Sequence, residues 1–192
     1  MSKFILASNS PRRSELLSKI GYKPNLIIGA NIDETPYEKE LPRKYVLRIA
    51  TEKAENIAKK HPGNFILSGD TIVTNQRQII QKAFSDLEIE RNLKLLSGKQ
   101  HKVLSAICLI QPNNKLSSKV ITSIVHFKQF TKRDIEDYLK TQEGLNKAGG
   151  YAIQGFAEAF VKYISGSYSN VMGLPLYETR NLLISAKVKT NK

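Results

Sequence analysis

The sequence predicts an α/β protein, with a mixed sheet and helices on its faces. Short apolar runs typical of buried strands alternate with amphipathic helical patterns, which favours helices packed against a sheet. Near the middle, two long strand patterns over 101–111 and 116–130 flank the turn-rich stretch "PNNK", which is typical of an antiparallel pair. We therefore expect a mixed sheet in two lobes rather than a purely doubly wound fold.

The first elements have clear beginnings and ends. The apolar run 3–7 predicts a buried strand. Ser10 as N-cap and Pro11 at the first helical position predict a helix, which Gly21 ends. A second strand pattern over 25–35 leads into an acidic loop.

The rest of the chain continues the alternation. An amphipathic helix is predicted over 41–61, then a strand over 64–73 with a break at Gly69 and Asp70. Residues 74–80 predict a hairpin return. The later predictions are helices over 85–98 and 131–142, capped by Ser85 and Thr131, an irregular glycine-rich stretch over 143–175, and a closing helix over 174–187.

The composition narrows the class of protein. Lysine and arginine number 30 against 17 acidic residues, a net charge of +13, which attracts phosphates; a lysine-rich composition without functional meaning is the alternative. The single cysteine, Cys108, excludes an internal disulfide and a zinc–thiolate cluster. No apolar run reaches the roughly 20 residues of a membrane span, and the apolar run at the N-terminus is too short for a signal peptide. We expect a cytoplasmic protein without a membrane partner.

Several familiar catalytic motifs are absent. The sequence has no GxxxxGK[ST] loop, no GxGxxG fingerprint and no GxSxG elbow. His61, His101 and His126 are isolated from one another and from cysteine, which argues against a histidine–cysteine metal site. A covalent nucleophile is not indicated.

The stretch "SNSPRRSELL" predicts an anion site. A strand that ends in small polar residues before a capped helix presents free backbone N–H groups. Arg12 and Arg13 lie in the first helical turn, where the helix dipole disfavours cations, and a bound polyphosphate would reverse that cost. The alternative is that Glu15 or another surface acid pairs with each arginine.

Acidic residues follow two predicted strands. Asp33 and Glu34 come after one of them, and Asp70 stands beside a glycine at the end of another. Such carboxylates suit a hard divalent cation, and one of them could act as a general base for water. Taken one by one, each is more typical of a turn or a cap, and the site is favoured only because acidic and basic residues both occur at predicted strand ends.

Two lysines and one glutamine complete the candidates. Lys53 and Lys82 are each typical of a solvated surface, although Lys53 stands at the edge of an apolar helix face and could reach inward. Gln154 lies in the glycine-rich stretch 143–175, where an amide could read a base edge. The alternative for that stretch is a packed loop that covers the sheet.

These stretches together resemble the Maf nucleotide pyrophosphatases, also called septum formation inhibitor proteins. The motifs occur in the family's order and extend from about Leu6 to Leu176. They are "LASNSPRRSELL", "IDET", "TEKA", "SGDTIV", "IIQKAFS", "LSGKQHKV", "AGGYAIQG" and "GSYSNVMGLPL". One departure concerns Lys82: the family usually has Gly-Lys-Pro where this chain has Gln81, Lys82 and Ala83, so the shape of that loop and the role of Lys82 stay open.

The resemblance implies a fold related to the inosine triphosphate pyrophosphatases, an elongated mixed sheet with two lobes around a cleft. It implies one such domain over 1–186. The composition of the last residues predicts a basic tail over 187–192. The implied reaction is hydrolysis of a nucleoside triphosphate to the monophosphate and pyrophosphate with Mg²⁺ or Mn²⁺. The implied role is removal of noncanonical or excess nucleotides, with an influence on cell division as a further possibility. A homodimer is compatible with the family, and no stable nucleic-acid partner is expected.

The resemblance also assigns roles to residues. Asp70 matches the catalytic base, and Asp70 with Glu34 would hold the metal. The positions that match phosphate handling are Ser8, Arg12, Arg13, Lys53 and Lys82. Arg12, Thr71 and Gln154 match positions linked to base choice, and the threonine and glutamine resemble the subgroup that acts on dTTP and UTP. The alternatives are a purine-directed pyrophosphatase, acting on ITP, XTP or 7-methyl-GTP, and a non-catalytic nucleic-acid binder attracted by the charge.

Overall fold

The computed structural model describes residues 2–190, so part of the predicted basic tail, residues 191 and 192, lies outside the described residues. The chain forms two compact units. Unit 1 comprises Met1–Asp70, Ser105–Ile121 and Gly173–Lys192, and unit 2 comprises Thr71–Leu104 and Thr122–Met172. The strands pair in the order β2-β1-β3-β5-β6-β7, with β4 beside β3, and both parallel and antiparallel pairs occur. The predicted α/β class with a mixed sheet is confirmed, whereas the cleft stays a prediction.

The N-terminal strand of unit 1 is buried along its whole length. β1 (Phe4–Ala7) runs parallel to β2 (Leu26–Ile27) and to β3 (Phe65–Asn75). In this register Phe4 lies opposite Phe65. A continuous apolar run is what a parallel strand covered on both faces requires. The longer strand predicted over 25–35 is wrong, because only the two residues of β2 pair with β1 and the chain has no helix or strand over 28–41.

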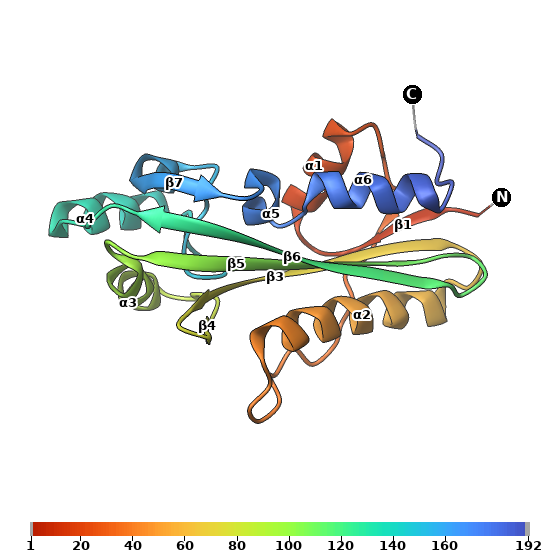
Figure 1. The fold of residues 1–192 in the computed structure, drawn as a ribbon, viewed down its shortest axis with the longest axis horizontal. Helices are drawn as coiled ribbons and strands as arrows, with labels where there is room; N and C mark the ends of the chain where they lie inside the picture. The colour runs from red at the N-terminus through yellow and green to blue at the C-terminus, as the bar shows by residue number, and fades with distance from the viewer. Residues whose placement is uncertain (1, 191–192) are drawn as a thin grey trace. The chain divides into compact units, whose positions relative to one another are not determined.

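Three helices cover the strands of unit 1. α2 (Pro42–Lys60) lies on one side of the strands, and α1 (Pro11–Lys19) and α6 (Leu176–Ser185) lie on the other (Figure 1). The apolar face predicted for α2 is confirmed, since its buried residues recur at helical spacing. Ser10 is the N-cap residue of α1, as predicted, but its side chain makes no capping hydrogen bond.

The break predicted in the strand at Gly69 and Asp70 is wrong. β3 runs without interruption through both residues. A Cβ atom at position 69 would lie 3.2 Å from the Ala106 carbonyl oxygen and 3.2 Å from the Arg13 Nε atom. The glycine therefore permits close packing within an unbroken strand rather than a turn.

The first part of unit 2 agrees with the predicted elements. β3 turns through Gln76 and Arg77, both with positive φ, into β4 (Gln78–Ile80), which confirms the hairpin return. In α3 (Asp86–Leu96) the Ser85 side chain accepts a hydrogen bond from the Glu88 amide. In α4 (Lys132–Thr141) the predicted cap Thr131 forms a capping box with Asp134.

The long strands in the middle of the chain are also confirmed. They are β5 (Gln100–Ile110) and β6 (Leu116–Phe127), which are neighbours in the sheet. Both strands continue through the two units.

The stretch 143–175 contains more regular structure than predicted. It includes a 3₁₀ helix, η1 (Phe156–Phe160), the strand β7 (Val161–Ser165) and the short helix α5 (Tyr168–Met172). β7 pairs antiparallel with β6. The strand escapes prediction because none of its five side chains is buried, so its sequence carries no apolar periodicity.

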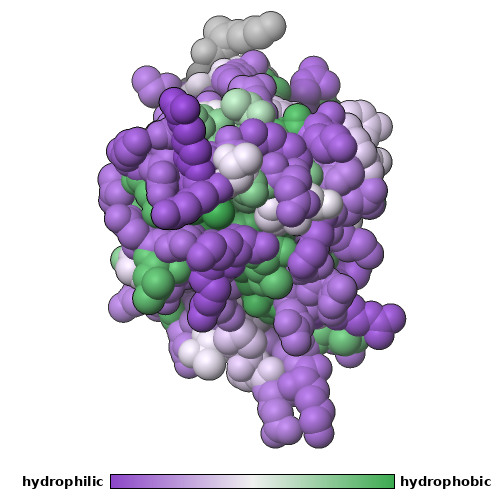
Figure 2. Space-filling model, turned by 90° about the vertical axis from the view of Figure 1, so that its left-hand side faces the viewer, coloured by the Kyte–Doolittle hydropathy of each residue, from purple (hydrophilic) through white to green (hydrophobic). Residues whose placement is uncertain are grey.

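The view in Figure 2 is mainly hydrophilic, with hydrophobic residues exposed in small separate areas. This agrees with the strongly basic composition and shows no extended apolar patch on that face. Among residues 2–190, none of the helices combines the length and the apolar character needed to cross a membrane.

Candidate functional site

The centre of the candidate site in unit 1 is a lysine shared by two carboxylates. The Lys53 Nζ atom lies 2.8 Å from Glu34 Oε1 and 2.8 Å from Asp70 Oδ1. Lys53 is only 8% exposed and Asp70 only 5%. Charged side chains are rarely buried to this extent unless they are paired. The interpretation of Lys53 as a solvated surface lysine is wrong.

Three different elements bring these residues together. Lys53 follows the buried stripe of α2 by one turn, since it stands four residues after Ile49. Asp70 lies in the uninterrupted strand β3. Glu34 lies in the segment 28–41 between β2 and α2, which has no helix or strand.

Arg13 is the second buried cation of unit 1. Its Nη1 atom donates to Ser8 Oγ at 2.9 Å, and its Nε atom donates to the Gly173 carbonyl oxygen at 2.9 Å. Burial lowers the pKa of Arg13, and the negative charge of Asp70 opposes that effect. Arg13 thus turns toward buried polar groups; these hydrogen bonds do not support the alternative of a surface pair with Glu15.

Ser8, in the loop between β1 and α1, organises the start of α1. Ser8 Oγ accepts the Ser10 amide at 3.1 Å as well as the hydrogen bond from Arg13. The positive charge of neighbouring Arg12 contributes to lowering the pKa of Arg13. Unit 1 therefore gathers two consecutive arginines in the first turn of α1 and a buried serine just before it, which is the arrangement expected of an anion site.

The geometry of Glu34 and Asp70 shows whether they could bind a divalent cation. Two distances of 2.8 Å from one ammonium place Glu34 Oε1 and Asp70 Oδ1 at most 5.6 Å apart. The Lys53 ammonium shows that these two oxygens can share one positive charge. Over residues 2–190, no group of three or more His, Cys, Asp or Glu side chains is placed to hold a metal ion. Two carboxylates fit Mg²⁺ or Mn²⁺ if phosphates and water complete the coordination, as is usual for Mg²⁺.

The remaining candidates belong to unit 2. Thr71 follows Asp70 in β3 and is half-buried, while Lys82 and Gln154 are exposed. The backbone of Lys82 forms an isolated antiparallel bridge with Ala148, at the start of the "AGGYAIQG" motif. Unit 2 thus brings the Lys82 loop to the glycine-rich segment.

The glycines of that motif have a structural reason. Gly149 and Gly150 have φ values of 72° and 73°, which disfavour a side chain. A Cβ atom at Gly149 would lie 2.9 Å from a Val73 methyl carbon. The alternative of a packed loop is therefore right for these two glycines, while Gln154 remains exposed in the same segment.

Sequence reasoning missed two residues that contact the Glu34 segment. Tyr45 Oη donates to the Glu34 carbonyl oxygen at 2.8 Å, and Arg48 Nη2 donates to the Thr35 carbonyl oxygen at 3.1 Å. The sequence could have indicated Tyr45, because it stands eight residues before Lys53 on the same buried face of α2. The contacts with the preceding segment have no signal in the sequence.

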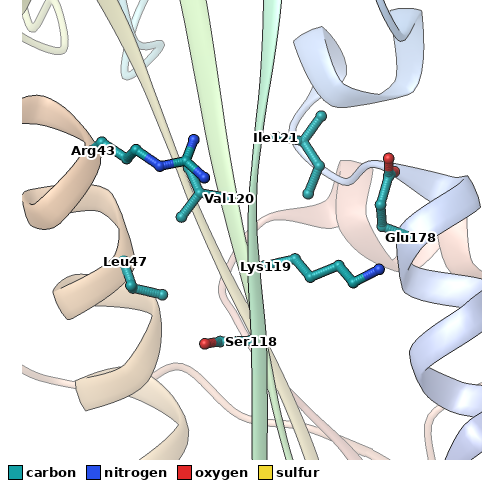
Figure 3. A pocket seen from close by; sticks show the side chains of 7 residues that line it. All are labelled: Arg43, Leu47, Ser118, Lys119, Val120, Ile121 and Glu178. Atoms are coloured by element: carbon teal, nitrogen blue, oxygen red, sulfur yellow. The ribbon is translucent and has the colours of Figure 1, made fainter.

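A pocket of about 470 Å³ also lies in unit 1 (Figure 3). Arg43 and Leu47 reach it from α2, and Glu178 reaches it from α6 on the other side of β6. The rest of its lining is the run 118–121 of β6. It contains none of the predicted site residues, so the buried carboxylates and arginines, and not this pocket, are the candidate site.

Comparisons with known proteins agree with the resemblance. The chain is 51% identical over 185 residues to a dTTP/UTP pyrophosphatase of Zymomonas mobilis, covering 96% of this chain and 92% of that protein. It is 47% identical to a dTTP/UTP pyrophosphatase of Sphingopyxis alaskensis, covering 98% of each. A nucleoside triphosphate pyrophosphatase of Orientia tsutsugamushi is 43% identical, with 94% and 90% covered.

Among solved structures, a HAM1 protein from Coxiella burnetii is similar at a TM-score of 0.47 and 14% identity, covering 96% of this chain and all of that one. At so low a score, the relation to the inosine triphosphate pyrophosphatases stays a prediction. Residues 3–186 match the family described as Maf-like protein. The match covers nearly the whole chain, and the chain belongs to this family.

Proposed function

We propose that this protein hydrolyses dTTP and UTP to the monophosphate and pyrophosphate. The observation that carries the proposal is the Lys53 ammonium shared by Asp70 and Glu34, in a chain about half identical to proteins named for that activity. A buried cation between two carboxylates beside two arginines has the charges that a metal-bound triphosphate needs. Its role would be to remove excess or noncanonical nucleotides.

Asp70 is the proposed general base. A water molecule attacks the α-phosphorus, the bond from that phosphorus to the oxygen bridging to the β-phosphate breaks, and pyrophosphate leaves. Lys53 donates to Oδ1 of Asp70, so we assign Oδ2 to accept the proton of the water. The position of Lys53 keeps the Asp70 carboxylate in one orientation, which a base requires.

Glu34 and Asp70 are the proposed ligands of Mg²⁺ or Mn²⁺. When bound, the metal would neutralise charge that develops on the phosphates. The proposed phosphate clamp consists of Ser8, Arg12, Arg13, Lys53 and Lys82. Positioning and electrostatic stabilisation supply most of the catalysis in phosphoryl chemistry, which explains so basic a set of residues. Thr71 and Gln154 are the proposed readers of the pyrimidine edge.

The test is pyrophosphate release from a panel of nucleotides. The panel contains dTTP, UTP, CTP, ITP, XTP and 7-methyl-GTP, each with Mg²⁺ and with Mn²⁺. We expect the highest kcat/KM with dTTP and UTP. Preference for ITP, XTP or 7-methyl-GTP would contradict the substrate assignment, and no release from any nucleotide would contradict the enzymatic function.

A further inference from the structure

The segment 28–41, which carries Glu34, has no helix or strand, yet polar contacts fix it at several points. The Asp33 carboxylate accepts the Thr35 amide at 2.8 Å, and the Glu40 carboxylate accepts the Tyr37 amide at 3.1 Å. The Tyr37 carbonyl oxygen accepts the Glu40 amide at 3.1 Å, which closes a turn. These contacts give the segment a defined local shape but do not attach it to the rest of unit 1.

Arg48 of α2 makes that attachment. Its guanidinium forms a fork with Glu40, with Nε donating to Oε1 at 2.8 Å and Nη2 donating to Oε2 at 2.7 Å. The same Nη2 donates to the Thr35 carbonyl oxygen at 3.1 Å. The fork is largely shielded from water, with side-chain exposures of 16% for Arg48 and 8% for Glu40. A two-pronged pair of this kind fixes direction as well as distance.

Two further contacts hold the guanidinium itself. Its central carbon lies 3.8 Å from the centre of the Tyr37 ring, so the arginine stacks on the segment that it binds. Its Nη1 lies 3.3 Å from the Glu52 carboxylate, one helical turn along α2. The hydrogen bonds that Arg48 donates to the Glu40 and Glu52 carboxylates raise the pKa of Arg48, so the fork stays charged over the working range of pH.

α2 therefore holds Glu34 at both its backbone and its side chain. Tyr45 Oη donates to the Glu34 carbonyl oxygen, and Lys53 contacts the Glu34 carboxylate. Arg48 fixes the residue that follows Glu34, which leaves Glu34 little freedom to move.

We propose that Arg48 is a positioning residue that, with Glu40 and Tyr45, holds the Glu34 carboxylate ready for the divalent metal. The inference rests on the proposed function, because it assigns Glu34 as a ligand. It adds a residue that acts on the metal site through the segment carrying Glu34. Partners of metal ligands commonly change metal affinity when they are altered, whereas a residue that only supports the fold would lower stability without changing the metal requirement.

The test compares Arg48→Lys, which keeps the charge and loses the fork, with Arg180→Lys, an exposed arginine on α6. We expect Arg48→Lys to raise the Mn²⁺ concentration for half-maximal pyrophosphate release by about tenfold, with a much smaller change in kcat at saturating Mn²⁺. A second readout needs neither metal nor nucleotide. Lys39 is exposed within the segment, and trypsin should cut after it faster in Arg48→Lys than in Arg180→Lys.

An unchanged Mn²⁺ requirement in Arg48→Lys, or the same rise in Arg180→Lys, would overturn the proposal. Equal cutting after Lys39 in the two variants would also overturn it. If Arg48→Lys does not fold, the Mn²⁺ requirement is compared in Tyr45→Phe, which removes one hydroxyl, and in its exposed control Tyr177→Phe. The same requirement in these two variants would overturn the proposal. If wild-type protein released no pyrophosphate, the proposed function would fail, while the trypsin comparison would still show whether Arg48 fixes the segment.

Discussion

The segment 28–41 of unit 1 and the segment 143–160 of unit 2 both carry candidate site residues, Glu34 and Gln154, but different interactions hold them. The first is held by charged hydrogen bonds, chiefly the fork between Arg48 and Glu40. The second is held largely by packed rings and a few hydrogen bonds to backbone amides.

The aromatic packing of unit 2 is continuous. The centre of the Phe160 ring lies 4.9 Å from that of Phe130 and 5.5 Å from that of Phe156. The Tyr138 hydroxyl accepts the Ala152 amide at 3.0 Å, and the Glu143 carboxylate accepts the Phe156 amide at 2.8 Å. The difference teaches that substitutions of residues that hold the first segment should alter metal-dependent chemistry, and those in the packed rings of the second should alter stability.

The largest expected effect on stability is in the aromatic packing. Phe160→Ala should lower the free energy of unfolding by about 3–5 kcal/mol, because it empties a buried ring site. Its Mn²⁺ requirement should change less than that of Arg48→Lys. Urea denaturation measures the loss of stability, and Mn²⁺ titration measures the metal requirement. A stability loss below 1 kcal/mol would contradict the claim that packed rings hold the second segment.

Lys53→Met should lower the free energy of unfolding by less than Phe160→Ala does, and Mn²⁺ should restore part of that loss. It leaves Asp70 and Glu34 facing each other without the shared ammonium. We expect a loss of about 2–3 kcal/mol, less than for a fully buried pair because Glu34 is one-third exposed. Mn²⁺ should recover more stability in Lys53→Met than in Lys59→Met, an exposed lysine of the same helix. Equal recovery in the two variants would contradict the assignment of the carboxylates as ligands.

The stability of the protein should also depend on pH through His101, which lies in unit 2. Burial, with a smaller contribution from the charge of His126, lowers the pKa of His101 to about 3, below the ordinary value of 6.5. Its Nε2 atom lies 2.8 Å from the Tyr151 hydroxyl, and its ring packs on Phe127. The unfolded chain therefore binds the proton first, so this stability is fully present above pH 6.5 and is lost as the pH falls toward 3.

The expected loss through His101 is about 1.4 kcal/mol for each pH unit below 6.5. Urea denaturation at pH 7, 6 and 5 measures it in a range above the ordinary pKa values of the carboxylates. His101→Gln should flatten the dependence, and His61→Gln should leave it unchanged. The same slope in His101→Gln and in the wild type would show that the buried histidine is not its source.

The smallest expected effect separates two helix caps that look alike in the sequence. Thr131→Ala should cost about 1 kcal/mol, because the threonine side chain caps α4. Ser10→Ala should cost less, since Ser10 makes no side-chain cap on α1. Thermal unfolding of the two variants checks the order, and a larger loss for Ser10→Ala would reverse the interpretation.

Much of the fold could be predicted because local pattern and burial agree. The buried stripe of α2, the apolar run of β1 and the cap at Thr131 all follow from residue spacing. β7 could not be predicted, because its side chains are not buried and its pairing with β6 sets its conformation. Gly69 misled the prediction, because glycine occurs both where a strand is interrupted and where packing inside a strand leaves no room for a side chain.

The site was predictable residue by residue, but only in part as an arrangement. Motif order identified Glu34, Lys53 and Asp70 as candidates, while the ammonium between the two carboxylates emerges only when three elements meet. Arg48 was missed because its partners Thr35 and Glu40 come from an irregular segment with no periodic signal. The family match covers residues 3–186, whereas only the hydrogen bonds of the structure indicate how Glu34 is held.

The central claim is that the carboxylates around Lys53 perform the chemistry. Asp70→Asn tests it most directly, by kcat with dTTP and Mn²⁺ and by the melting temperature of the same sample. We predict that kcat falls by about 10²–10⁴ while the variant stays folded, and that Asp137→Asn, at a solvent-facing position of α4, keeps wild-type turnover. Wild-type turnover in folded Asp70→Asn would contradict the account.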